Sequence, residues 1–171
     1  AKTIINDEPF AVLLADDLTD ANTPVLKQLI MQHQKEQSSV IAIEDIPKEK
    51  TVQYGIVDVG DSKNNLYKIN SIVEKPQPND APSTLGVIGR YVFNPEIFDC
   101  LEKIKPGKGG EIQLTDAIQM LLAQQSIFAY QFEGVRYDCG DKLGFMKANI
   151  EFSKKHPEIG KEFIAFLKSV S

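Results

Sequence analysis

Residues 10–17 read FAVLLADD, an apolar run followed at once by two aspartates, Asp16 and Asp17. A short apolar run bounded by polar residues predicts a strand that is buried on both faces, as in parallel sheets. Ligands of α/β sheets lie beyond the carboxyl ends of the strands. We therefore expect a ligand near Asp16, which follows this strand. The alternative is that one aspartate caps a turn and the other is solvated.

Strand-like and helix-like segments alternate along the rest of the chain. Apolar or alternating runs predict further strands at residues 39–43, 51–59, 66–73, 85–93 and 127–132. Helical spacing of apolar residues predicts helices at residues 23–35, 95–104, 111–125, 142–156 and 157–170. The strands on either side of residues 60–65 form a hairpin with a longer loop. The pattern predicts an α/β fold with a mixed, mostly parallel sheet flanked by helices.

The composition is that of one globular domain. The 171 residues are 42% hydrophobic and 25% charged, which is enough chain for a buried core. A net charge of −5 attracts neither nucleic acid nor an anionic membrane in bulk, and no apolar run approaches the roughly 20 residues that span a bilayer. Cys100 and Cys139 have no CxxC spacing, so we expect no zinc site, no disulfide framework and a reduced, cytoplasmic compartment.

A second carboxylate, Asp138, follows another strand in the segment Tyr137-Asp138-Cys139-Gly140. Two acids from separate strand ends can clamp one divalent metal and offset the charge of a triphosphate. The alternative for Asp138 is a simple turn before a helix.

Glu74 and Lys75 precede Pro76, which disfavours helical backbone at Lys75. We expect the two side chains to lie on an extended segment and to point apart, where a lysine can neutralise a phosphate and an acid can accept sugar hydroxyls. A surface ion pair is the alternative. Gly55 lies within a strand pattern, which indicates either a bulge or the close approach of a ligand.

Several segments in this order resemble the bacterial UTP–glucose-1-phosphate uridylyltransferases, also called UDP-glucose pyrophosphorylases. The similar segments are residues 11–16, 53–55, 73–76, 89–91, 111–118 and 138–144, and they extend over nearly the whole chain. The resemblance implies a Rossmann-like fold of the nucleotide-diphospho-sugar transferase type. It also implies that residues 1–171 form a single nucleotidyltransferase domain, incomplete at its N-terminus, with residues 142–171 as C-terminal helices.

The resemblance further implies a Mg²⁺-dependent reaction. A phosphate oxygen of glucose 1-phosphate attacks the α-phosphate of UTP, which gives UDP-glucose and pyrophosphate. The matching catalytic residues are Asp16 and Asp138, which bind the metal, and Lys75, which holds the sugar phosphate. The matching substrate-binding residues are Glu74 at the glucose hydroxyls, Gly55 and Val87 near the sugar, and Asp17 near the ribose. The family also forms dimers or tetramers, so a homo-oligomer is expected.

The family's Gly-x-Gly-Thr-Arg nucleotide segment does not occur in these residues, and Ala15 replaces the family's usual proline. We therefore expect the chain to correspond to the carboxyl-terminal part of the enzyme and to be inactive alone. Two alternatives stay open. One is another sugar-1-phosphate nucleotidyltransferase that uses dTTP or ATP, and the other is a non-catalytic sugar-nucleotide binding module.

Overall fold

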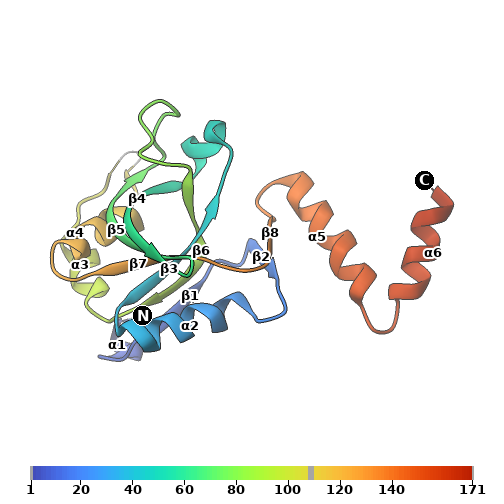
Figure 1. The fold of residues 1–171 in the computed structure, drawn as a ribbon, viewed down its shortest axis with the longest axis horizontal. Coiled ribbons are helices and arrows are strands. Elements are labelled where there is room, and N and C mark those ends of the chain that lie inside the picture. Colours follow the sequence, from blue (N-terminus) through green and yellow to red (C-terminus); the bar gives the residue numbers. More distant parts are fainter. Residues whose placement is uncertain (1, 108–109, 171) are drawn as a thin grey trace.

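The computed structural model describes residues 2–107 and 110–170. It contains a six-stranded sheet with helices packed against it, a two-stranded ribbon, and two final helices that extend away from the large sheet (Figure 1). The strands are β1 (Phe10–Leu13), β2 (Asp17–Asp20), β3 (Ser39–Asp45), β4 (Gly55–Lys63), β5 (Leu66–Glu74), β6 (Leu85–Phe93), β7 (Ile127–Gln131) and β8 (Val135–Asp138). The helices are α1 (Lys2–Ile5), α2 (Val25–Glu36), the 3₁₀ helix η1 (Lys48–Gln53), α3 (Ile97–Lys103), α4 (Leu114–Leu122), α5 (Lys142–Lys155) and α6 (Gly160–Val170).

The large sheet is mixed, as predicted, but most of its pairings are antiparallel. The strand order is β1-β6-β3-β7-β5-β4, and in the described part of the chain only β3 and β7 pair in parallel. The prediction of a mostly parallel sheet was therefore wrong. A continuous apolar run predicts that both faces of a strand are buried, but it does not indicate the direction of the neighbouring strands.

The strand that is buried on both faces is β3. Ile41 and Ile43 pack with α3 and α4 on one face, whereas Val40 and Ala42 pack with α2 on the other. Side chains alternate across a strand, so β3 ties the two halves of the core together. Full burial of β1 was wrongly predicted, because β1 lies at the edge of the sheet, where Leu13 is exposed.

The hairpin of β4 and β5 has a tight turn. The prediction of a longer loop at residues 60–65 was therefore wrong. Lys63 pairs with Leu66, which leaves Asn64 and Asn65 as the turn. Their φ angles are 53° and 61°, and two successive positive φ values are typical of a type I′ turn, in which asparagine is favoured. Residues 60–63 belong to β4 but are exposed, and exposed polar residues of a strand have the same composition as a loop.

One edge of β6 is shared by two strands, and their separation creates a fork. Residues 90–93 pair with β1, whereas Gly86 pairs with Ile56 of β4. β3 occupies the opposite edge of β6. Between the two partners, residues 87–89 of β6 have no strand partner on this edge in the described part of the chain, and Gly89 is instead bound there by Leu14 and Asp17, beyond the end of β1.

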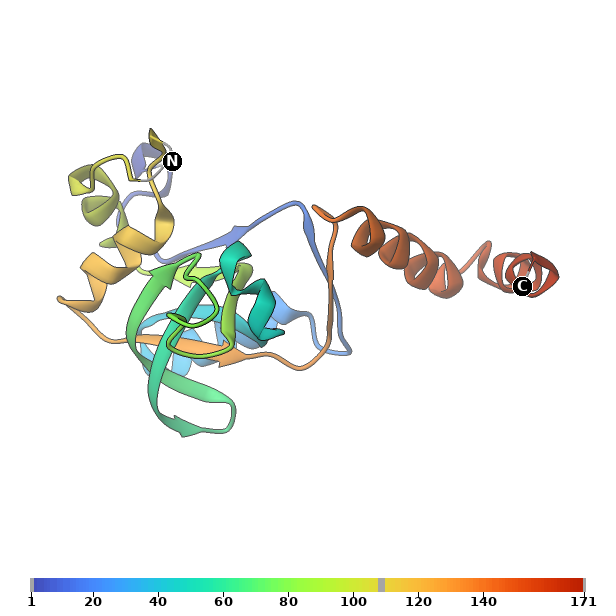
Figure 2. The same ribbon diagram turned by 90° about the horizontal axis from the view of Figure 1, so that it is seen from above.

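The ribbon of β2 and β8 connects the sheet with the last two helices. Asp17 lies opposite Asp138 in its antiparallel register. The helices predicted at residues 142–156 and 157–170 are confirmed as α5 and α6, which extend away from the large sheet (Figures 1 and 2). In the described residues, no helix is both long and apolar enough to cross a membrane.

Candidate active site

A cavity of about 450 Å³ opens at the fork in β6, and we call it the fork cavity. Strands β2, β4, β5, β6 and β8, the residues that follow β1, and the start of α4 contribute to its wall. All seven site residues predicted from the sequence line it: Asp16, Asp17, Gly55, Glu74, Lys75, Val87 and Asp138. The fold therefore brings the seven together, while the role of each stays a prediction.

The carboxylates of Asp16 and Asp138 converge on one glycine, Gly140. A Cβ atom built on Gly140 would lie 3.2 Å from Oδ1 of Asp138 and 3.5 Å from Oδ2 of Asp16. The backbone N–H of Cys139 donates to the carbonyl oxygen of Asp16 at 2.7 Å, which fixes the spacing of the two segments. Both carboxylates consequently lie on the same side of the molecule and face the same small region.

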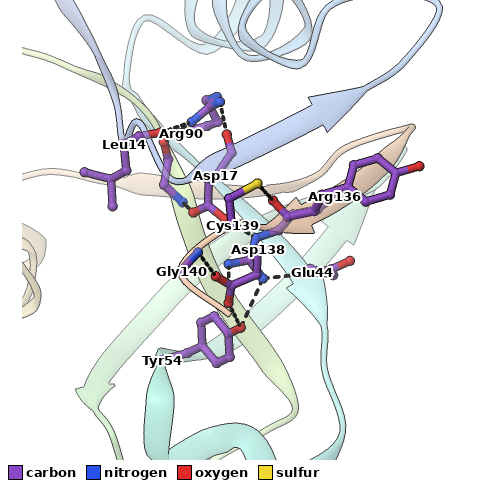
Figure 3. A network of polar contacts seen from close by, with 11 residues as sticks. Leu14, Asp17, Glu44, Tyr54, Arg90, Arg136, Asp138, Cys139 and Gly140 are labelled. Carbon is purple, nitrogen blue, oxygen red and sulfur yellow. Dashed lines mark hydrogen bonds and ion pairs between the residues drawn. The ribbon is translucent and has the colours of Figure 1, made fainter. Parts of the chain in front are cut away.

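Arg136 of β8 is the centre of a buried polar network (Figure 3). Its Nε donates to Oδ1 of Asp17, its Nη2 lies 3.3 Å from Oδ2 of Asp138, and its Nη1 lies 3.5 Å from Oε2 of Glu44. The side chains of Arg136 and Asp17 are each only 7% exposed. One guanidinium therefore joins three carboxylates from β2, β3 and β8, and the planar fork of arginine suits such bridging.

Tyr54, which follows η1, completes this network. Its hydroxyl donates to Oδ2 of Asp138 at 2.9 Å and accepts from Nη1 of Arg136 at 3.1 Å. The Arg136 guanidinium also lies 5.1 Å from the centre of the Tyr54 ring, within cation–π range. These contacts occupy Oδ2 of Asp138, so Oδ1 is the oxygen that faces Gly140 and Asp16.

The same contacts set the charge of Asp138. Burial acts to raise the pKa of this carboxyl, but the Tyr54 hydroxyl, the Arg136 charge and the N–H groups of Gly140 and Asp141 outweigh it. The pKa of Asp138 is consequently held below its ordinary value. Asp138 is thus ionised at neutral pH, as a metal ligand must be.

Asp17 is held on all sides by protein groups. Its Oδ2 accepts from the backbone N–H of Gly89 at 2.7 Å, and its Oδ1 accepts from Arg136. Arg90 donates to the carbonyl oxygens of Leu14 and Asp17 and so fixes the turn between β1 and β2. In this structure Asp17 anchors the ribbon to β6. Its contact with a ribose stays a prediction.

The geometry of Glu74 and Lys75 differs from the extended, splayed arrangement expected. Lys75 has a φ angle of +46°, and its Nζ lies 3.4 Å from Oε1 of Glu74. The expectation was wrong because the residue before Pro76 avoids right-handed helical backbone by adopting the left-handed conformation here. The backbone N–H of Lys75 donates to the carbonyl oxygen of Tyr54 at 2.9 Å, which supports this unusual turn. Both side chains therefore face the fork cavity together.

Gly55 lets α4 approach the wall of the cavity. A Cβ atom at this position would lie 2.7 Å from Cγ2 of Thr115 and 3.5 Å from Oε2 of Glu74. The first distance is too short for any side chain larger than glycine. Sequence reasoning expected either a bulge or the close approach of a ligand at Gly55. The structure shows the close approach of the Thr115 side chain, and contact with a ligand stays a prediction.

Sequence reasoning did not identify Arg136, Tyr54 or Thr115 as site residues. The sequence does contain a signal for Arg136. It precedes Asp138 by two residues, and residues two apart on a strand lie on the same face. Tyr54 and Thr115 lie in segments 53–55 and 111–118, which carry the family resemblance, but nothing in their spacing indicated that the tertiary fold brings their side chains to the wall.

The residues present suit a hard cation that needs few protein ligands. The described residues hold no cluster of three or more His, Cys, Asp or Glu residues able to bind a metal. They do place Oδ1 of Asp138 and Oδ2 of Asp16 within 3.2 and 3.5 Å of the Cβ position of Gly140, and Mg²⁺ is typically bound by one or two carboxylates together with substrate phosphates and water. A closed structural metal site is not indicated by this set, whereas a substrate-completed one fits it.

Comparison with known proteins gives close relatives over the full chain. The UTP–glucose-1-phosphate uridylyltransferase 1 of Staphylococcus saprophyticus is 47% identical over 171 residues, which is 100% of this chain and 60% of the relative. The UTP–glucose-1-phosphate uridylyltransferase of Bacillus subtilis is 48% identical over 170 residues, 99% of this chain and 58% of the relative. The chain thus spans about 60% of the length of these curated relatives.

Solved structures agree with this result. A UDP-glucose pyrophosphorylase complexed with UDP-glucose superimposes with a TM-score of 0.86 at 44% identity, over 91% of this chain and 60% of that chain. A UTP-bound enzyme of this type from Acinetobacter baumannii gives a TM-score of 0.87 at 38% identity, over 99% of this chain and 59% of that chain. The family model described as nucleotidyl transferase matches residues 1–155. The chain therefore belongs to the nucleotidyl transferase family.

Proposed function

We propose that this protein is a UTP–glucose-1-phosphate uridylyltransferase, which transfers a uridylyl group from UTP to glucose 1-phosphate and releases UDP-glucose and pyrophosphate. The observation that carries the proposal is the gathering of the seven predicted residues around one cavity. The names of the relatives, 47% and 48% identical over essentially the whole chain, support the same reaction.

The chemistry needs positioning and charge neutralisation more than a protein nucleophile. The attacking atom is a phosphate oxygen of glucose 1-phosphate, and the electrons of the broken bond leave with pyrophosphate. A site for such a reaction must hold two anions in line and offset their repulsion. The fork cavity offers a lysine for the phosphate, and its two carboxylates, Asp16 and Asp138, would hold a divalent cation that supplies the remaining positive charge.

Each residue of the wall takes a distinct part in the proposal. Lys75 holds the phosphate of the sugar ester, and Glu74 beside it accepts hydrogen bonds from hexose hydroxyls. Gly55 and Val87, which line the cavity, contact the sugar. In the complete nucleotide site, Asp17 lies near the ribose and keeps the ribbon of β2 and β8 in place.

Asp16 and Asp138 hold Mg²⁺ in this proposal. The ion, when bound, supplies positive charge that polarises the phosphate and offsets its developing charge. Arg136 and Tyr54 hold Asp138 by its other oxygen, so the ligating oxygen is oriented before substrate arrives. This support explains why four protein groups surround a carboxylate that is partly exposed to solvent.

The proposal extends to the setting of the enzyme. We place it in the cytoplasm as a homo-oligomer, a dimer or tetramer. Side chains of α5 and α6 that are apolar and exposed support a contact between copies: Leu143, Phe145, Met146, Ile164, Phe166 and Val170. We treat residues 1–171 as one domain that is incomplete at its N-terminus, in which residues 142–171 are the C-terminal helices.

Calorimetric titration of the 171-residue chain with glucose 1-phosphate and with UDP-glucose, in the presence of Mg²⁺, tests the proposal. We expect both ligands to bind. We expect no turnover with UTP, because the 171 residues contain no Gly-x-Gly-Thr-Arg segment for the nucleotide. Absence of binding to both ligands would contradict the proposed function. UDP-glucose formation by this chain alone would contradict only the statement that it is inactive.

A nucleotide competition assay addresses the alternatives. It uses a version of the protein that carries the family's nucleotide segment and compares UTP with dTTP and ATP as donors. Preference for dTTP or ATP would identify a different nucleotidyltransferase. Binding without turnover of any donor would identify a non-catalytic sugar-nucleotide module.

A further inference from the structure

Thr115, in the first turn of α4, carries a hydroxyl group without a protein partner. The residue is 9% exposed and lies in the wall of the fork cavity. Among the side-chain N and O atoms of the described residues, Oγ1 of Thr115 is buried and makes no hydrogen bond. Buried polar groups are nearly always paired, and an unpaired one destabilises the folded protein by about 1–3 kcal/mol. Thr115 lines the fork cavity, so a ligand bound there is the candidate for the missing partner of this hydroxyl.

The methyl group of Thr115 has a separate, structural contact. Its Cγ2 packs against the α-carbon of Gly55, at 2.7 Å from the place where a Cβ would lie. This packing holds the methyl toward β4, so the hydroxyl occupies a different direction from the same Cβ. The two halves of the threonine side chain can consequently be tested independently, by valine for the hydroxyl and by serine for the methyl.

The charges beside Thr115 select the chemistry of the partner. Oε2 of Glu74 lies 3.5 Å from the same point above Gly55, on a carboxylate that repels phosphate. Tyr91, also in the wall, stays neutral because burial, with the charges of Asp17 and Glu74, raises its pKa to about 12. A neutral hydroxyl group suits this corner, and such mixed apolar and polar walls are typical of small-molecule sites.

We infer that Thr115 determines specificity for the sugar by hydrogen-bonding one hydroxyl group of the hexose through Oγ1. The inference rests on the proposed function and deepens it, since it assigns a sugar contact to α4 in addition to those on β4, β5 and β6. Thr115 and Glu74 then lie on either side of Gly55 and bind the sugar, while Lys75 binds its phosphate.

Thr115→Val tests the inference because it removes the hydroxyl and keeps the shape. We expect glucose 1-phosphate to bind about tenfold more weakly, the loss of one hydrogen bond to a buried group. The melting temperature of the ligand-free variant stays the same or rises, because an unpaired buried hydroxyl is removed. A hydroxyl with a purely structural partner would instead give a lower melting temperature and unchanged affinity, which would overturn the inference.

Thr115→Ser is the matched control, since it keeps the hydroxyl and removes the methyl that packs on Gly55. We expect its affinity for glucose 1-phosphate to stay within about threefold of the wild type, well short of the effect of valine. Equal losses for serine and valine would overturn the inference, because they would assign the effect to packing.

A series of 2-, 3-, 4- and 6-deoxyglucose 1-phosphates identifies the hydroxyl. For one of these sugars we expect the wild type to lose about tenfold in affinity and Thr115→Val to lose nothing further, since the partner is already absent. Equal losses in both proteins for every deoxy sugar would overturn the inference while leaving the proposed function intact. If the wild type binds neither glucose 1-phosphate nor UDP-glucose, the proposed function itself fails, and the inference fails with it.

Discussion

Arg136 and Asp138 lie two residues apart on β8, and Nη2 of the arginine is 3.3 Å from Oδ2 of the aspartate. The same guanidinium reaches Asp17 on the paired strand β2 and Glu44 on β3. A single side chain thus joins the ribbon that carries Asp138 and begins directly after Asp16 to the large sheet (Figure 3). The position of the site depends on this arginine.

Replacement of Arg136 by alanine is expected to destabilise the protein strongly. It leaves the buried carboxylate of Asp17 without its charged partner, and loss of one member of a buried ion pair costs about 3–5 kcal/mol in the free energy of unfolding. Urea denaturation measures this change. Lys161→Ala, on the exposed surface of α6, is the control and should change the free energy by less than about 0.5 kcal/mol. Equal stability of the two variants would show that the network does not support the fold.

Lys75→Ala is expected to weaken the binding of glucose 1-phosphate by about ten- to a hundredfold, since hydrogen bonds to charged groups contribute about 1.5–3 kcal/mol. Lys68 is exposed on β5 outside the fork cavity, so Lys68→Ala is the control for loss of one positive charge. Calorimetric titration of both variants makes the comparison. Matching affinities would remove Lys75 from the phosphate site.

Gly55→Ala is expected to disturb both stability and sugar binding. The new methyl group would lie 2.7 Å from Cγ2 of Thr115, so α4 or β4 must shift, and overpacking of this kind costs about 1–3 kcal/mol. Gly60→Ala is the control, because its nearest neighbour is the side chain of Asn70 at 3.2 Å on an exposed part of the hairpin. Thermal melting with and without UDP-glucose distinguishes the two. A Gly55→Ala protein that melts and binds like the control would contradict the close approach.

The free energy of unfolding is expected to depend on pH in the alkaline range because of Tyr91. Burial, together with the charges of Asp17 and Glu74, raises its pKa from 10.0 to about 12. The unfolded chain therefore loses this proton first, so the stabilisation is complete below pH 10 and disappears as the pH rises toward 12. At pH 11 the loss amounts to about 1 kcal/mol, which corresponds to one pKa unit of differential protonation.

Denaturation of the wild type and of Tyr91→Phe at pH 9 and pH 11 checks this expectation. Phenylalanine has no titrating hydroxyl, so the variant should lose less free energy of unfolding over this interval than the wild type. Identical losses would mean that Tyr91 titrates normally in the folded protein.

Much of the fold followed from patterns that depend on local sequence. The strand at residues 85–93 and the two final helices were predicted within a few residues of β6, α5 and α6. Segments of this kind carry their own periodicity or caps. The gathering of the seven candidate residues followed from the family resemblance, whereas their individual spacing left simpler explanations open.

The errors concern properties that no single segment encodes. The apolar runs of β1 and β3 look alike, yet β1 is an edge strand and β3 is central, because neighbours decide the burial of a strand. The left-handed backbone of Lys75 depends on a hydrogen bond to Tyr54, which lies far along the chain. Thr115 became a candidate only when the structure placed this residue in the cavity wall and left its buried hydroxyl without a partner.

The convergence of Asp16 and Asp138 is tested most directly by calorimetric titration of Mg²⁺ into the protein in the presence of UDP-glucose. We predict one ion per chain, and we predict that Asp16→Asn and Asp138→Asn each weaken its binding at least about tenfold, as loss of a charged ligand should. Asp61→Asn, on the exposed end of β4, should bind Mg²⁺ like the wild type. Two independent ions, each lost with one aspartate, or unchanged binding in either variant, would contradict a shared site.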